Sequence, residues 1–136
     1  MQTFLPYQDF ELSAKCLDYR RLGKQRVECK QILMALTGQS KGWVNHPATR
    51  MWRGYEGALT DYAIHVCREW KSRGYMDSLE NWFRDVPIPE KTLWYPKWLS
   101  EDFCLSHQSN LVRKFPEHYR KYFPDVPDDL SYIWPV

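Results

Sequence analysis

Several motifs of common enzyme classes are missing from this sequence of 136 residues. It has no glycine-rich phosphate loop of the Walker type, no GxSxG, no HExxH, and no pair of carboxylates at metal-ligand spacing within one element. Its four histidines, His46, His65, His107 and His118, are far apart in the sequence, so a metal site would have to be assembled from distant segments. These absences argue against nucleotide, serine-hydrolase and zinc-protease chemistry, and we expect neither a metal nor a cofactor.

Paired cysteines and membrane signals are also lacking. Cys16, Cys29, Cys67 and Cys104 occur singly without CxxC spacing, which predicts reduced, buried thiols rather than a zinc knuckle or redox pair. The first residues, MQTFLPYQDF, do not combine a basic segment with an apolar run, and no apolar stretch is long enough to span a bilayer. We expect a cytoplasmic protein without membrane contact.

Aromatic residues, by contrast, are abundant. They make up 16% of the chain, with seven Trp and nine Tyr, which suits a core of large rings or stacking on nucleic-acid bases. The length predicts a single domain over residues 1–136. The net charge of +2 is small, so a nucleic acid would have to be bound by a local basic face.

The hydrophobic periodicity predicts an all-α fold, a single compact domain of about three main helices with long loops. A short apolar arm, Met1–Leu12, should lie across the body of the domain. The expected elements are helices over 12–36, 47–73 and 100 or 101–114, a short helix over 76–83, and an irregular aromatic-rich C-terminal tail. Gly23 lies inside the first helix, where another backbone can approach.

Polar side chains fall on the apolar face of the first predicted helix. Asp18, Arg21, Gln25 and Glu28 share an arc with Leu22 and its apolar neighbours at a periodicity of about 100° per residue. Charged groups on a buried face are costly unless they are paired and hydrogen-bonded. The row therefore predicts either a cleft or a structural ladder of ion pairs. Basic residues surround it, as phosphate binding would require.

Three segments resemble the pyrimidine-dimer DNA glycosylases with coupled AP lyase activity, the endonuclease V type of phages. They are LDYRRLGKQRV in the first helix, HPATRMWRGYEGALTDYAIHVCREWKSRGY in the second, and SNLVRKFPEHYRKYF at the third helix and tail. The segments follow the family's order and spacing over most of the chain. Of the single residues, Tyr19, Arg20, Leu22, Lys114, His118, Tyr119 and Tyr122 match the family pattern.

The resemblance implies a metal-independent DNA repair enzyme, with hydrolase and lyase activities and without cofactors, that acts as a monomer on double-stranded DNA. It implies an intracellular enzyme, associated with the nucleoid or present in a phage-infected cell. Members flip a base out of the duplex and attack C1′ with an amino-terminal α-amine, which forms a Schiff base. An α-amine titrates near pH 8, so a useful fraction is nucleophilic at neutral pH, and a nearby carboxylate can stabilise the cationic sugar.

Two positions depart from the family pattern, and in the family both positions take part in the reaction. The family's glutamate follows Tyr-Arg directly, where this chain has Arg21, so Glu28 on nearly the same helix face is the predicted substitute, with Asp18 second. The second residue, Gln2, is too large for ready removal of the initiator methionine, so the predicted amine is that of Met1, with Lys24 as the alternative. The predicted catalytic set is therefore Met1, Glu28, Asp18, Arg21 and Lys24.

A wider group of residues is expected to contact DNA. It comprises Arg20, Gln25, Arg26, His46, His107, Asn110, Lys114, His118, Tyr119 and Tyr122. Other interpretations stay open for several of them, since His46 can cap its helix and the aromatic rings can fill the core. Two further functions also stay open: a glycosylase of the same fold for another damaged or modified base, and a DNA-binding module without catalysis.

Overall fold

The fold consists of helices and loops, in agreement with the predicted all-α class. A computed structural model describes residues 1–136 and contains no strand. The helices are α1 (Phe10–Cys16), α2 (Tyr19–Leu36), α3 (Pro47–Arg50), α4 (Glu56–Ser72), α5 (Glu80–Asp85), α6 (Glu101–Lys114) and α7 (Pro116–Tyr119). Three of them, α2, α4 and α6, are long, and the other four are short. None of the helices has both the length and the apolar composition that crossing a bilayer requires.

The first predicted helix is divided in two just before the polar row. Helix α1 begins after Asp9, whose side chain accepts a hydrogen bond from the Leu12 amide. Leu17 then adopts an extended conformation and is fully buried, and Asp18 becomes the residue that precedes α2. The prediction of one helix over 12–36 was therefore wrong at this point. The apolar pattern continues in phase through the break, so periodicity alone did not reveal it.

The second predicted helix is also interrupted. His46 caps α3, since its Nδ1 accepts a hydrogen bond of 3.0 Å from the Ala48 amide. After α3 the chain turns at Gly54, which has φ of 89°, a conformation that favours glycine. The predicted single helix over 47–73 is thus a short helix followed by a turn and α4. The predicted end is correct, because Gly74 follows with φ of 93°.

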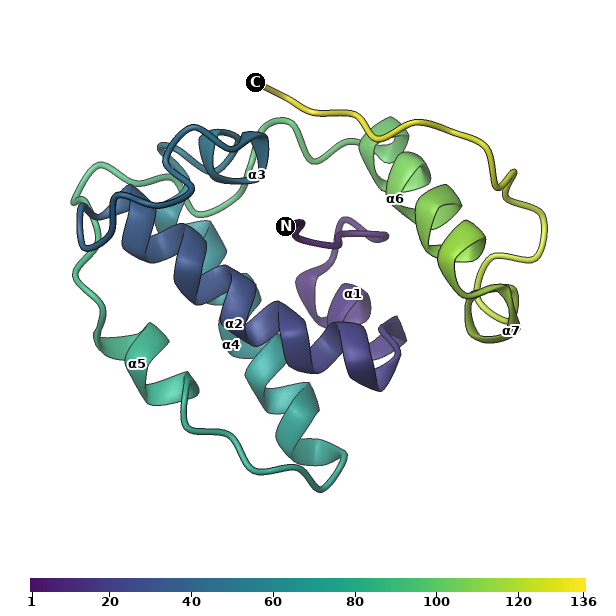
Figure 1. Cartoon of the computed structure of the whole chain (residues 1–136), viewed down its shortest axis with the longest axis horizontal. Helices are drawn as coiled ribbons and strands as arrows, with labels where there is room; N and C mark the ends of the chain where they lie inside the picture. Colours follow the sequence, from purple (N-terminus) through teal and green to yellow (C-terminus); the bar gives the residue numbers. More distant parts are fainter.

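The remaining elements follow the prediction with small shifts. The expected helix over 76–83 lies slightly later, as α5. Helix α6 has the predicted bounds, and the Ser100 hydroxyl caps it by accepting a hydrogen bond of 3.1 Å from the Phe103 amide. The C-terminal tail is irregular apart from α7, and in Figure 1 it runs along the outside of α6.

Helices α2 and α4 pack side by side and form the base of the molecule (Figure 1). At Gly23 the neighbour is a side chain rather than the backbone that the sequence suggested. A Cβ atom there would lie 2.8 Å from Cη2 of Trp70, which projects from α4. Glycine is therefore required by a close approach of an indole ring.

The amino-terminal arm lies across the core, as predicted. Thr3 and Leu5 are fully buried. Trp52 Nε1 donates to Thr3 Oγ1 over 3.0 Å, and the Leu5 amide donates to His107 Nδ1 over 3.1 Å. The arm thus contacts both the α3 region and α6. In Figure 1 the amino terminus lies in the middle of the molecule, between α2 and α6.

Candidate active site

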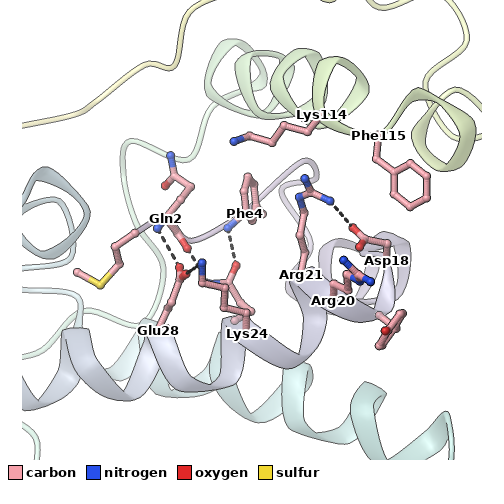
Figure 2. Close-up of a pocket in the computed structure, with 12 residues that line it drawn as sticks. Gln2, Phe4, Asp18, Arg20, Arg21, Lys24, Glu28, Lys114 and Phe115 are labelled. Carbon is pink, nitrogen blue, oxygen red and sulfur yellow. Dashed lines mark hydrogen bonds and ion pairs between the residues drawn. The ribbon is translucent and has the colours of Figure 1, made fainter.

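A cavity of about 730 Å³ opens between the arm, α2 and the end of α6 (Figure 2). All four members of the polar row line it, so the row faces a cleft. The lining residues are Met1, Gln2, Phe4, Asp18, Tyr19, Arg20, Arg21, Lys24, Gln25, Glu28, Lys114 and Phe115. The cavity brings together the five residues predicted as catalytic and three of those predicted to contact DNA, Arg20, Gln25 and Lys114.

Glu28 is held against the backbone of the arm. Its Oε2 accepts a hydrogen bond of 2.9 Å from the Gln2 amide, and its Oε1 lies 3.6 Å from Lys24 Nζ. The Glu28 side chain is only 12% exposed, whereas that of Lys24 is 77% exposed. A hydrogen bond to a carboxylate is stronger than one between neutral groups. Glu28 is therefore a largely buried carboxylate that is hydrogen-bonded to the residue next to Met1.

Gln25 fastens the arm to α2 and uses its whole amide to do so. Its Oε1 accepts hydrogen bonds from the Phe4 amide (2.7 Å) and the Tyr62 hydroxyl (3.1 Å), and its Nε2 donates to the Gln2 carbonyl (2.8 Å). Gln25 is 1% exposed. Its polar atoms are occupied within the protein, so it positions the arm and has no free group for the DNA contact that was predicted.

Asp18 forms the other end of the polar row, in a compact group with Arg21 and Tyr119. The Tyr119 hydroxyl donates to Asp18 Oδ1 and accepts from the Asp18 amide over 3.0 Å, and Arg21 Nη1 lies 3.1 Å from Oδ1. Burial acts to raise the pKa of Asp18, but the hydrogen bonds from Tyr119 and Arg21 outweigh it and lower the pKa. Asp18 is an ionised carboxylate whose charge is already compensated. Tyr119 is fully buried, which leaves no surface for the predicted DNA contact.

Positive charge predominates around the cavity. Arg20, Arg21, Lys24 and Lys114 line it together with only two carboxylates. Lys114 comes from the opposite side to α2 (Figure 2) and takes part in none of the ion pairs of the structure. Lys114 is exposed, but its partial burial, and then the charges of Arg21, Arg113 and Lys24, lower its pKa. Such a surface attracts anions such as phosphates.

Three residues predicted to contact DNA have their partners within the protein and lie outside the cavity. Arg26 binds Asp77 through Nη2 (2.6 Å) and lies over the Trp70 ring. His107 is 0% exposed, and burial lowers its pKa to about 3, so it is a neutral part of the core. Asn110 is buried and donates to the Leu130 carbonyl over 3.0 Å, which fastens the tail to α6. His107 and Asn110 therefore present no exposed surface to a duplex.

The other three residues predicted to contact DNA, His46, His118 and Tyr122, lie outside the cavity. His46 is partly buried as a helix cap, and its pKa is lowered by burial and then by the positive amino terminus, while Glu28 opposes the shift. His118 lies 2.8 Å from the Cys16 carbonyl through Nε2. Tyr122 is exposed beside His118. None of the three lines the cavity.

Four cavity residues were absent from the predicted site. Gln2 and Phe4 belong to the arm, and only knowledge of where the arm lies could have placed them. Phe115 directly follows Lys114, so its position was a weak signal. Tyr19 was named only as a match to the family pattern. Tyr19 and Phe115 are both exposed, and each stacks on a further ring outside the cavity, Tyr75 and His118 respectively.

The cysteines do not supply a nucleophile. All four are buried and unpaired, as predicted. Burial raises the pKa of Cys16, Cys67 and Cys104 to about 12. Because the thiolate is the reactive form, these side chains are inert packing groups at neutral pH.

Comparison with known proteins gives a match at the level of the family. Residues 1–81 match the model of a family described as "Pyrimidine dimer DNA glycosylase". The matched part includes the arm, α2 and Glu28. No curated protein and no solved structure matches the chain significantly.

Proposed function

The chain belongs to the pyrimidine dimer DNA glycosylase family, and from this we propose that it excises pyrimidine dimers from duplex DNA and then cleaves the strand as an AP lyase. The observation that carries the proposal is the contact between the arm and Glu28. The carboxylate accepts a hydrogen bond from the amide of Gln2, the residue after Met1, inside a cavity lined by both residues. An amine and a carboxylate are the two groups that the proposed reaction needs, and Met1 and Glu28 line the same cavity.

The proposed nucleophile is the α-amine of Met1. As the glycosidic bond breaks, positive charge develops on the sugar, and the nearby Glu28 carboxylate stabilises it. The amine forms a bond to C1′ while the base departs with the bonding electrons, and the nitrogen then loses a proton to solvent. The C1′–O4′ bond breaks as O4′ takes up a proton, and the nitrogen lone pair forms the C1′=N bond of an iminium ion. The nucleophile is thus supplied by the protein, and we propose that no metal takes part.

Of the two predicted carboxylates, Glu28 has the stronger support. It is hydrogen-bonded to the arm beside the proposed nucleophile. The charge of Asp18 is compensated by Arg21 and by the Tyr119 hydroxyl, at the far end of the polar row. We therefore assign the catalytic role to Glu28, and to Asp18 a role in positioning Arg21.

The remaining cavity residues suit a flipped nucleotide. Arg20 and Arg21 provide guanidinium groups, which bind phosphate oxygens in a bidentate manner. Phe4, Tyr19 and Phe115 provide aromatic surfaces for an unstacked base. We propose that the enzyme binds duplex DNA as a monomer and flips a nucleotide into this cavity.

Trapping of the covalent intermediate tests the function directly. The protein is incubated with ultraviolet-irradiated duplex DNA and, separately, with abasic duplex DNA, and borohydride is added to reduce any iminium to a stable amine. The adduct is mapped by mass spectrometry. We expect an adduct at residue 1 with both substrates.

The variant Lys24→Arg distinguishes the two candidate amines. It keeps the positive charge near Glu28 but cannot form an imine, so an adduct that persists at residue 1 identifies the α-amine. An adduct that maps to Lys24 in the wild type and vanishes in the variant would transfer the role to that lysine. Trapping with abasic but not irradiated DNA would retain the lyase and change the base that is excised. Absence of adducts with both substrates, despite DNA binding, would refute the mechanism and leave a binding module.

A further inference from the structure

Both carboxylates of the cavity already have partners within the protein, and a lyase needs a base in the second half of its reaction. After the iminium ion forms, the proton on C2′ must be removed before the 3′ phosphate can leave. Both oxygens of Glu28 have partners, the Gln2 amide and Lys24 Nζ. Asp18 is bonded to Tyr119 and Arg21, which hold it in its weakly basic, ionised form.

We propose that Lys114 is the general base of the lyase step, an inference that rests on the proposed function. The side chain enters the cavity from α6, across from Glu28 and Lys24 on α2 (Figure 2). It is therefore on the opposite side of the cavity from the arm–Glu28 contact where the nucleophile is proposed. A sugar bound between the two sides would present C1′ to one group and C2′ to the other.

The surroundings of Lys114 favour the neutral amine that a base requires. It has no carboxylate partner, in contrast to Lys24 and Arg21. The charges that act on its pKa are those of Arg21 and Lys24 on α2 and Arg113 on α6, and all three are positive; the two carboxylates of the cavity, Asp18 and Glu28, are paired with Arg21 and Lys24. Lys114 is an exposed residue, but its partial burial and these three charges lower its pKa, so a larger fraction is neutral near pH 7 than for an ordinary lysine.

The step balances in the following way. The neutral amine of Lys114 takes the C2′ proton, and the C2′–H electrons form the C1′=C2′ bond of an enamine as the iminium nitrogen gains its lone pair. That lone pair then re-forms the iminium, C2′=C3′ forms, and the C3′–O bond breaks with the phosphate as leaving group. Water hydrolyses the iminium to release an unsaturated aldehyde and the free α-amine. Lys114 returns its proton to solvent.

The variant Lys114→Arg separates a base from a phosphate contact, because arginine keeps the charge but does not act as a base near neutral pH. Abasic duplex DNA is used, with strand nicking and borohydride trapping measured in parallel under single-turnover conditions. We expect nicking to fall about a hundredfold or more, in line with the contribution of general bases. Trapping should stay at the wild-type yield or rise, since the iminium accumulates. Lys121→Arg, an exposed lysine outside the cavity, is the matched control and should change neither measurement.

The pH dependence gives a second measurement that a phosphate contact would not affect. The ratio of wild-type to Lys114→Arg nicking rates should rise with pH until Lys114 is neutral and then stay constant, because only the wild-type elimination step depends on deprotonation of Lys114. A nicking rate of Lys114→Arg equal to that of the wild type would overturn the proposal and make Lys114 a phosphate contact. Loss of both trapping and nicking in the variant would also overturn it, by placing Lys114 at or before imine formation. Failure of the wild type itself to trap and nick would refute the proposed function.

Discussion

Replacing Glu28 by glutamine should separate the chemistry of this carboxylate from its structural role. The amide oxygen of glutamine can still accept the hydrogen bond from Gln2, so the arm should stay in place. A charged hydrogen bond is replaced by a weaker neutral one, so the free energy of unfolding should fall by about 1 kcal/mol. The ion pair with Lys24 adds little, because that lysine is 77% exposed.

The expected effect on catalysis is much larger. A charge about 4 Å from a cationic sugar is worth about 4 kcal/mol at an effective dielectric constant of about 20. Such an energy corresponds to a rate factor of about 10³, and removal of one stabilising group from an active site typically costs about 10²–10³. We therefore expect Glu28→Gln to nick abasic duplex DNA about 10²–10³-fold more slowly than the wild type.

Single-turnover nicking and urea denaturation, carried out on the same preparations, test this expectation. Asp18→Asn is the matched control, because it removes the other carboxylate of the row. It should show the opposite pattern, with a larger loss of stability and a smaller loss of rate, since Asp18 holds Tyr119 and Arg21. A nicking rate of Glu28→Gln within about threefold of the wild-type rate would refute the assigned role, because so small a change does not correspond to a lost charge.

Three other changes test the amine, the group around Asp18 and the packing at Gly23. Acetylation of the Met1 α-amine withdraws its lone pair, so borohydride trapping should fall to background while DNA binding, measured by gel shift, is retained. Tyr119→Phe should lower the free energy of unfolding by about 2–3 kcal/mol at pH 7, because it removes the hydroxyl from Asp18. Folding lowers the pKa of Asp18, so this stabilisation is present above the unfolded pKa of about 3.9 and is lost as the pH falls through the folded pKa. Urea denaturation should therefore show the free energies of unfolding of the two proteins becoming similar in acid. Gly23→Ala should destabilise by about 1–2 kcal/mol in urea denaturation, since its Cβ would overlap the Trp70 ring, and an unchanged or higher stability would show that the ring can move away.

The cleft was predictable because its residues lie on one helix. The spacing of Asp18, Arg21, Gln25 and Glu28 depends only on helical geometry, and placing charges on an apolar face requires compensation. All four do line the cavity. The interruption just before Tyr19 was not predictable from periodicity, although an aspartate before a helical run is a common N-cap residue.

The opposite side of the cavity could not be deduced in the same way. His107 and Asn110 on α6 are polar residues that the sequence placed equally well at a cleft or at the surface. Both are buried, because His107 accepts a hydrogen bond from Leu5, 102 residues away, and Asn110 binds the tail at Leu130. Such partners depend on how distant segments meet, and helical periodicity carries no information about this.

The dependence of the arm on α6 has a consequence for the order of events during synthesis. The hydrogen bond between Leu5 and His107 joins residues separated by 102 positions. At about 5–20 residues per second, the ribosome makes the second partner roughly 5–20 seconds after the first. During that interval the contact between the arm and α6 cannot form, and the arm is more open to the enzymes that trim or modify nascent chains. The proposed nucleophile is thus open to covalent modification before the cavity that would use it is complete.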